Sequence, residues 1–185
     1  MKIAVLGWGS LFWDPRMLKM SGEWKNDGPC LPIEFARVSS FNRLTLVIHP
    51  GVPCVKTLWI NSACEDLRDA IQNLADREDT FASNIGFISI PDNESRCNVV
   101  KGILPIIESW ATTKKIDALI WTDLASNRPK FTFEDVLDHL RGLKGEELKK
   151  AEEYVRKAPE QIRTERRSLI EQEFGWTPVN TCNKS

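Results

Sequence analysis

The sequence predicts a mixed α+β fold, because its middle part is rich in strand patterns and its C-terminal part is helical. Apolar or alternating runs that end at turn residues predict strands over residues 2–6, 32–39, 43–48, 54–60, 84–90, 97–107 and 116–122. Apolar positions at helical spacing predict a helix over residues 62–77. From Thr132 onward the pattern is helical again, with an interruption at Pro159.

The N-terminal elements have the clearest patterns. The continuous apolar run of residues 2–6 ends at Gly7 and predicts a buried first strand that enters a tight turn. Residues 12–30 contain too many turn residues for a long helix, so we expect a loop with at most one short helical turn. Residues 32–39 and 43–48 are separated by a short connection, and they are expected to pair as a hairpin.

The length of 185 residues is enough to bury one substantial core, so a single domain is expected. We place this domain at residues 1–178, with a core at 1–144 and a helical segment at 145–174, followed by a tail at 179–185. The helical segment is highly charged, and its apolar positions are sparse. This pattern favours a packed surface helix pair, and the alternative is a surface for a partner or for a homodimer.

The composition excludes several classes of protein. Its 25 basic residues are balanced by 26 acidic ones, which argues against a nucleic-acid partner. Neither a signal-peptide core nor a membrane-spanning stretch is present, so no membrane role and a cytoplasmic location are expected. The five cysteines are scattered and never spaced Cys-x-x-Cys, and the only histidines, His49 and His139, have no neighbouring second ligand. We therefore expect no metal.

The Gly7-Trp8-Gly9-Ser10-Leu11 loop after the first strand is the strongest candidate for a small-molecule site. A glycine-rich turn at this place can cradle the phosphates of a dinucleotide, but the required third glycine is replaced here by Phe12. A purely structural interpretation is a tight turn in which both glycines supply unusual backbone angles while Trp8 packs into the core. On local evidence this structural interpretation is favoured.

Further motifs give this loop a family context. Trp13-Asp14 follows it, and Phe35-Ala36-Arg37-Val38-Ser39 and Arg43-Leu44-Thr45-Leu46 come next. A second block consists of Leu58-Trp59-Ile60, a helix and then Leu74-Ala75-Asp76-Arg77-Glu78-Asp79-Thr80. Together they resemble the gamma-glutamylcyclotransferase-like family, whose hallmarks are a Tyr-Gly-Ser-Asn or Tyr-Gly-Ser-Leu loop and a catalytic glutamate in a Glu-Gly or Glu-Asp turn. The resemblance covers most of residues 1–150, and the last helix lies outside it.

The resemblance implies a strongly curved or barrel-like sheet flanked by helices. It also implies an enzyme, an acyltransferase or lyase without a cofactor, that cyclises a gamma-glutamyl group to 5-oxoproline and releases an amine or amino acid. Glu78 is then the catalytic base, and Gly7, Trp8, Gly9, Ser10 and Leu11 bind the substrate. Trp121 and Arg37 are additional candidates for the wall of the pocket.

Two positions depart from the family pattern. Trp8 replaces the usual tyrosine, so a phenolic hydroxyl is lost although an indole N–H donor remains. Asp79 stands where many members have glycine, which affects the turn beside Glu78.

The cyclisation itself needs no cofactor because the nucleophile and the electrophile belong to one molecule. A carboxylate such as Glu78 can remove the proton of the alpha-ammonium group, and N–H groups of the loop can bind the oxyanion or the alpha-carboxylate. A charged Arg-Glu-Asp triplet at a helix end is, however, also typical of a solvated surface. The competing functions are a non-catalytic protein that binds a small molecule on the same scaffold and, less favoured, a nucleotide-binding module.

Overall fold

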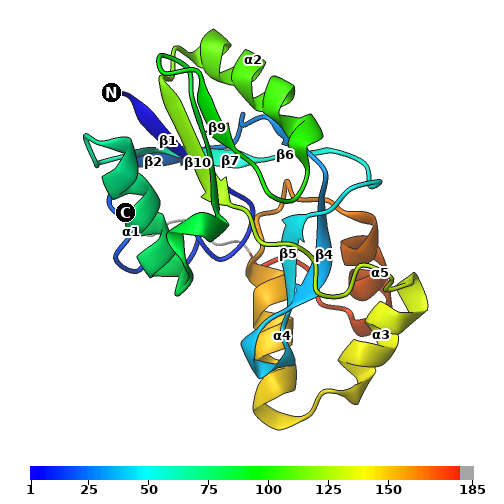
Figure 1. Cartoon of the computed structure of the whole chain (residues 1–185). Helices are drawn as coiled ribbons and strands as arrows, with labels where there is room; N and C mark the ends of the chain where they lie inside the picture. Colours follow the sequence, from blue (N-terminus) through cyan, green and yellow to red (C-terminus); the bar gives the residue numbers. More distant parts are fainter. Residues whose placement is uncertain (180–185) are drawn as a thin grey trace.

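A computed structural model describes residues 1–179 of the chain and shows a mixed α+β fold (Figure 1). The strands are β1 (Ile3–Gly7), β2 (Met20–Lys25), β3 (Cys30–Leu31), β4 (Ile33–Val38), β5 (Leu44–Ile48), β6 (Val55–Lys56), β7 (Leu58–Ser62), β8 (Ile85–Ser89), β9 (Glu94–Arg96) and β10 (Ala118–Thr122). The α-helices are α1 (Leu67–Glu78), α2 (Leu104–Lys114), α3 (Phe133–Gly142), α4 (Gly145–Lys157) and α5 (Glu165–Phe174). The proposed tail at 179–185 lies outside the described residues except for its first position.

The main sheet is open and mixed, with the strand order β2-β7-β1-β10-β8-β9. Strand β1 lies in its centre, parallel to β10 and antiparallel to β7, so that Val5 faces Ile120 on one side and Ile60 on the other. The family resemblance implied a strongly curved or barrel-like sheet, and the observed sheet does not close into a barrel. The edge strands β2 and β9 do not pair with each other, and the β4–β5 hairpin forms a separate ladder instead of closing the sheet.

Both faces of the main sheet are covered, which explains the continuous apolar run of the first strand. Ile3 and Val5 face a core layer that includes Leu74 of α1. Ala4 and Leu6 point the other way, into a larger core that includes α2 and the C-terminal helices. Figure 1 shows the β4–β5 hairpin grouped with α3, α4 and α5 beside the main sheet.

Most of the predicted elements are present, although the helix expected over residues 62–77 spans Leu67–Glu78 and the strand expected over 54–60 is divided into β6 and β7. Two further segments differ more strongly from the prediction. Residues 97–107 do not form a strand, because α2 begins at Leu104 with Pro105 in its first turn, where a proline is tolerated. The segment 12–30 contains strand β2, which pairs with β7 at the sheet edge. Its residues are exposed or only partly buried, so it lacks the apolar alternation that identifies a strand.

One buried arginine holds the C-terminal helices together. The Arg167 guanidinium donates to the carbonyl oxygens of Pro159 at 2.7 Å and of Ile162 and Ala158 at 2.9 Å each. Its Nε atom donates to the Glu171 carboxylate at 2.9 Å. These carbonyls belong to the segment between the end of α4 and the start of α5. Arg167 therefore fixes the connection between α4 and α5.

Within residues 1–179, no helix is long and apolar enough to cross a membrane.

Candidate functional site

The loop that follows β1 is a compact turn. The Phe12 amide donates to the Gly9 carbonyl at 3.0 Å, and the Asp14 amide donates to the Ser10 carbonyl at 2.8 Å. Trp8 is buried, and its indole N–H donates to the carbonyl oxygen of Leu46 at 3.3 Å. The indole donor that was expected to remain for a substrate is thus engaged with the β4–β5 hairpin.

The two glycines of the loop permit close packing. Neither Gly7 nor Gly9 has a positive φ, so the expectation that they supply unusual backbone angles is wrong. A Cβ atom at Gly7 would lie 2.8 Å from the ring of Trp24. A Cβ atom at Gly9 would lie only 2.4 Å from the hydroxyl oxygen of Tyr154. Glycine at position 9 is therefore what allows α4 to approach the loop.

The end of α1 brings Glu78 to this loop. Asp79 ends the helix in a left-handed conformation with φ 50°, a position that favours glycine. The preceding Arg77 has a buried side chain, and its guanidinium donates to the Glu78 carboxylate at 2.6 Å and to the Ser10 hydroxyl at 3.3 Å. The same group donates to the carbonyl oxygen of Asp14 at 3.2 Å. Arg77 therefore orients Glu78 and fixes the loop at the same time.

A cavity of about 550 Å³ opens in front of Glu78 and is lined by residues of the loop, of α1, of the hairpin and of α4. A narrow recess beside it is lined by Trp8, Gly9, Ser10, Leu11, Leu46, Glu78, Thr122 and Tyr154. The Glu78 side chain is 18% exposed. The structure thus brings Glu78 and residues 8–11 around one recess, whereas Gly7 lies behind it against Trp24.

Arg37 and Trp121 have different positions. Arg37 lines the larger cavity, and its guanidinium donates to the carbonyl of Ala125 at 2.7 Å. Trp121 is fully buried, and its indole packs so tightly over Gly86 that a Cβ atom there would come within 2.3 Å. It is part of the hydrophobic core and does not line these cavities, whose wall instead includes the next residue, Thr122.

Tyr154 is the main site residue that the sequence analysis did not include. It lies on α4 and its ring is buried, while its hydroxyl accepts from the amide of Leu46 at 3.4 Å. Among residues 1–179 this hydroxyl donates no hydrogen bond of its own. Burial raises the pKa of the Tyr154 hydroxyl to about 12, so it is protonated at neutral pH.

A signal for Tyr154 exists in the sequence. It is the only tyrosine of the chain, whereas the loop carries Trp8 at the position where the resemblance implied a tyrosine. The structure places the phenol of Tyr154, from α4, beside this loop. No local pattern connects two positions so far apart, which is why the sequence alone did not join them.

The site also contains arginines that the motifs did not indicate. Arg43 at the hairpin lies with its Cζ atom 5.2 Å from the ring centroid of Tyr154. Arg16 donates to the Asp14 carboxylate at 3.1 Å and to the Arg77 carbonyl at 3.3 Å. Both arginines line the larger cavity, together with Arg37 and Arg77. The site therefore presents two carboxylates, one phenol and four arginines, which suits an anionic ligand that carries an amine.

The described residues show no group of three or more His, Cys, Asp or Glu side chains that could hold a metal ion. No protein-family model, curated protein or solved structure matches the chain.

Proposed function

We propose that this protein is a gamma-glutamylcyclotransferase-type enzyme, which converts a gamma-glutamyl compound into 5-oxoproline and a free amine or amino acid. The observation that carries the proposal is the recess in which the Glu78 carboxylate faces residues 8–11 and Tyr154. A carboxylate on an open surface could not act on an enclosed substrate. Here its exposure is small, and a cavity of suitable size for such a compound lies in front of it.

The reaction begins when Glu78 removes a proton from the alpha-ammonium group of the substrate. The amine nitrogen then attacks the gamma-carbonyl carbon, and a second proton passes from this nitrogen to water as the five-membered lactam forms. The bond between the carbonyl carbon and the leaving nitrogen breaks, and Glu78 returns a proton to that nitrogen. The released amine takes up its last proton from water, so protons balance over the cycle. Arg77 holds the Glu78 carboxylate in place throughout.

Tyr154 supplies a donor for the charge that develops during ring closure. Negative charge builds on the carbonyl oxygen, and a preorganised donor in a water-poor site stabilises it. The Tyr154 hydroxyl has a proton without an acceptor among residues 1–179, and its pKa of about 12 keeps that proton bound. Tyr154 thereby takes over the role of hydroxyl donor for which Trp8 has no free group. Arg37, on the wall of the same cavity, is the group we assign to the substrate's alpha-carboxylate.

One observation favours the non-catalytic alternative, a protein that binds an amino-acid-like ligand on this scaffold. The Glu78 carboxylate already forms an ion pair with Arg77 at 2.6 Å. A carboxylate held in this way can bind an ammonium group without accepting its proton. The two functions differ in turnover and not in the ligand that they recognise.

The test measures 5-oxoproline release from gamma-glutamyl dipeptides, glutathione and gamma-glutamyl amines. Replacement Glu78→Gln should lower kcat by about 10²- to 10⁴-fold, the usual contribution of a general base. Asp76→Asn is the matched control, because Asp76 is an exposed carboxylate of the same helix and does not line the cavity. Equal rates for wild type and Glu78→Gln would refute the catalytic role. Wild-type binding of these compounds without any release would support the binding protein instead.

A further inference from the structure

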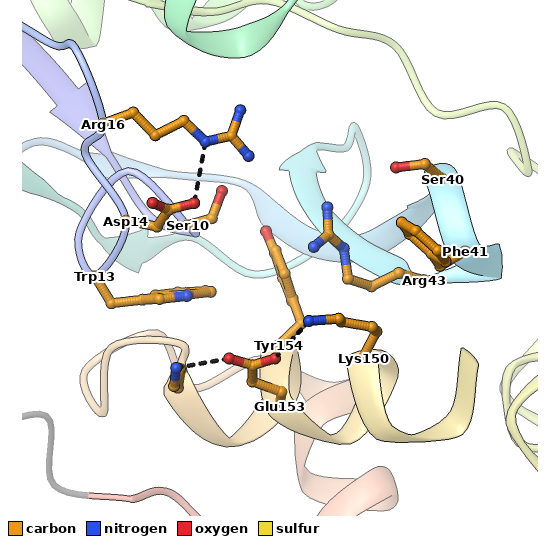
Figure 2. A pocket seen from close by; sticks show the side chains of 11 residues that line it. Ser10, Trp13, Asp14, Arg16, Ser40, Phe41, Arg43, Lys150, Glu153 and Tyr154 are labelled. Carbon is orange, nitrogen blue, oxygen red and sulfur yellow. Dashed lines mark hydrogen bonds and ion pairs between the residues drawn. The ribbon is translucent and has the colours of Figure 1, made fainter. Parts of the chain in front are cut away.

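A second cavity of about 430 Å³ adjoins the proposed catalytic site (Figure 2). It lies between the loop after β1, the tip of the β4–β5 hairpin and helix α4. The two cavities share Ser10, Arg16, Ser40, Arg43 and Tyr154 in their walls. A substrate whose carbonyl group lies at the Tyr154 hydroxyl can therefore extend from the first cavity into the second.

The second cavity carries an excess of positive charge. Its basic side chains are Arg16, Arg43, Lys150 and Lys157, and its only carboxylates are Asp14 and Glu153. Asp14 pairs with Arg16 at 3.1 Å, and Glu153 pairs with Lys157 at 2.6 Å and with Lys150 at 3.6 Å. Lys150 also lies 3.8 Å from Glu146, a residue outside the lining. Four cations thus face two carboxylates within the cavity.

Arg43 is the cation of this cavity without a carboxylate partner among residues 1–179. Its Nε atom donates to the Ser39 hydroxyl at 3.3 Å, which directs the rest of the guanidinium toward the space above Tyr154 (Figure 2). A guanidinium with free donors beside a cavity is suited to bidentate binding of a carboxylate.

The hairpin tip that carries Arg43 is held in a strained shape. Phe41 and Asn42 both have left-handed backbone angles, with φ 59° and 51°. Asn42 is clamped from two helices, because its amide donates to Glu147 at 2.8 Å and its carbonyl lies 2.8 Å from the ring nitrogen of His139. Strain of this kind persists where the surroundings fix it, as they do at binding sites. The C-terminal helices thus position the tip over the second cavity.

We propose that the second cavity, formed by Arg16, Arg43, Lys150 and Lys157 and named here the basic subsite, binds a leaving group that carries two carboxylates. The inference rests on the proposed function, because it assigns the group that departs when the lactam forms. The excess of two positive charges matches the two carboxylates of an acidic amino acid. Substrates of this class are gamma-glutamyl dipeptides with an acidic second residue, and gamma-glutamyl amines without a carboxylate are disfavoured.

The test uses three compounds of nearly equal size with two, one and no carboxylates on the leaving part: gamma-glutamyl-glutamate, gamma-glutamyl-glutamine and gamma-glutamyl-glutamine amide. Their affinities are measured by calorimetry with the Glu78→Gln protein, in which turnover is suppressed. Each lost carboxylate should weaken binding about tenfold, as expected for one charge-assisted hydrogen bond. Similar affinities for all three compounds would overturn the basic subsite.

Two variants locate the effect. Lys150→Gln should reduce the preference for gamma-glutamyl-glutamate over gamma-glutamyl-glutamine severalfold, and Arg43→Gln should reduce it further. Lys149→Gln is the matched control, because Lys149 is the exposed neighbour on α4 and does not line the cavity. An unchanged preference in both cavity variants would also overturn the proposal. Release of 5-oxoproline by the wild type is measured separately. A failure of the proposed enzymatic function and a failure of the basic subsite therefore give different results.

Discussion

A methyl group added at position 9 would collide with the hydroxyl group that we place in the site. The Cβ atom of Gly9→Ala would lie 2.4 Å from the Tyr154 hydroxyl oxygen and 3.4 Å from the ring carbon that bears it. The first distance is far inside van der Waals contact, and the second is an ordinary contact. The clash therefore depends on one oxygen atom.

The magnitude follows from these distances. Forcing extra volume into a packed site costs about 1–3 kcal/mol of folding free energy, and the loss of glycine's freedom in the unfolded chain returns about 0.4–1 kcal/mol. Gly9→Ala should therefore destabilise the wild type by about 1–2 kcal/mol. In a Tyr154→Phe background the same change should be neutral or slightly stabilising, because the oxygen is gone.

The assay is urea unfolding at neutral pH, followed by tryptophan fluorescence, for the four proteins of the double-mutant cycle. Gly102→Ala serves as a control, since a Cβ atom there meets nothing within 4 Å and its cost should be the same in both backgrounds. An equal cost of Gly9→Ala with and without the hydroxyl would refute the contact between α4 and the loop. It would also remove Tyr154 from the site.

Two further predictions concern buried polar groups. The pKa of Tyr154 is raised to about 12 from an unfolded value of about 10, so its contribution to stability is complete below pH 10 and is lost as the pH rises toward 12. The difference in unfolding free energy between wild type and Tyr154→Phe should shrink by about 3 kcal/mol over this range. The pKa is checked by absorbance titration of the single tyrosine, and half-ionisation near pH 10 would contradict the prediction. Arg167→Met should cost about 3–5 kcal/mol because it strands buried carbonyls and Glu171, whereas Arg163→Met, at an exposed partner of the same carboxylate, should cost less than about 1 kcal/mol. Equal losses of stability, measured by urea unfolding, would show that burial of Arg167 is not the cause.

Residues 97–107 and strand β2 differ from the sequence-based prediction for simple physical reasons. The apolar residues between 97 and 107 fit a strand or a helix equally well, and Pro105 is compatible with a first helical turn. Strand β2 lies at the edge of the sheet, where its side chains are mostly exposed, so its sequence shows no apolar alternation. Patterns of burial predict an element only where the element is buried on a regular face.

The sequence by itself determined the local features of this protein: the buried first strand that ends at Gly7, the β4–β5 hairpin, and the helix that ends at Glu78. Short-range periodicity and turn residues encode these features directly. Only the tertiary structure decided that the sheet stays open, that Trp121 belongs to the core, and that Tyr154 meets Gly9. These outcomes depend on which distant surfaces pack together, and the pattern of one segment carries no information about the shape of its partner.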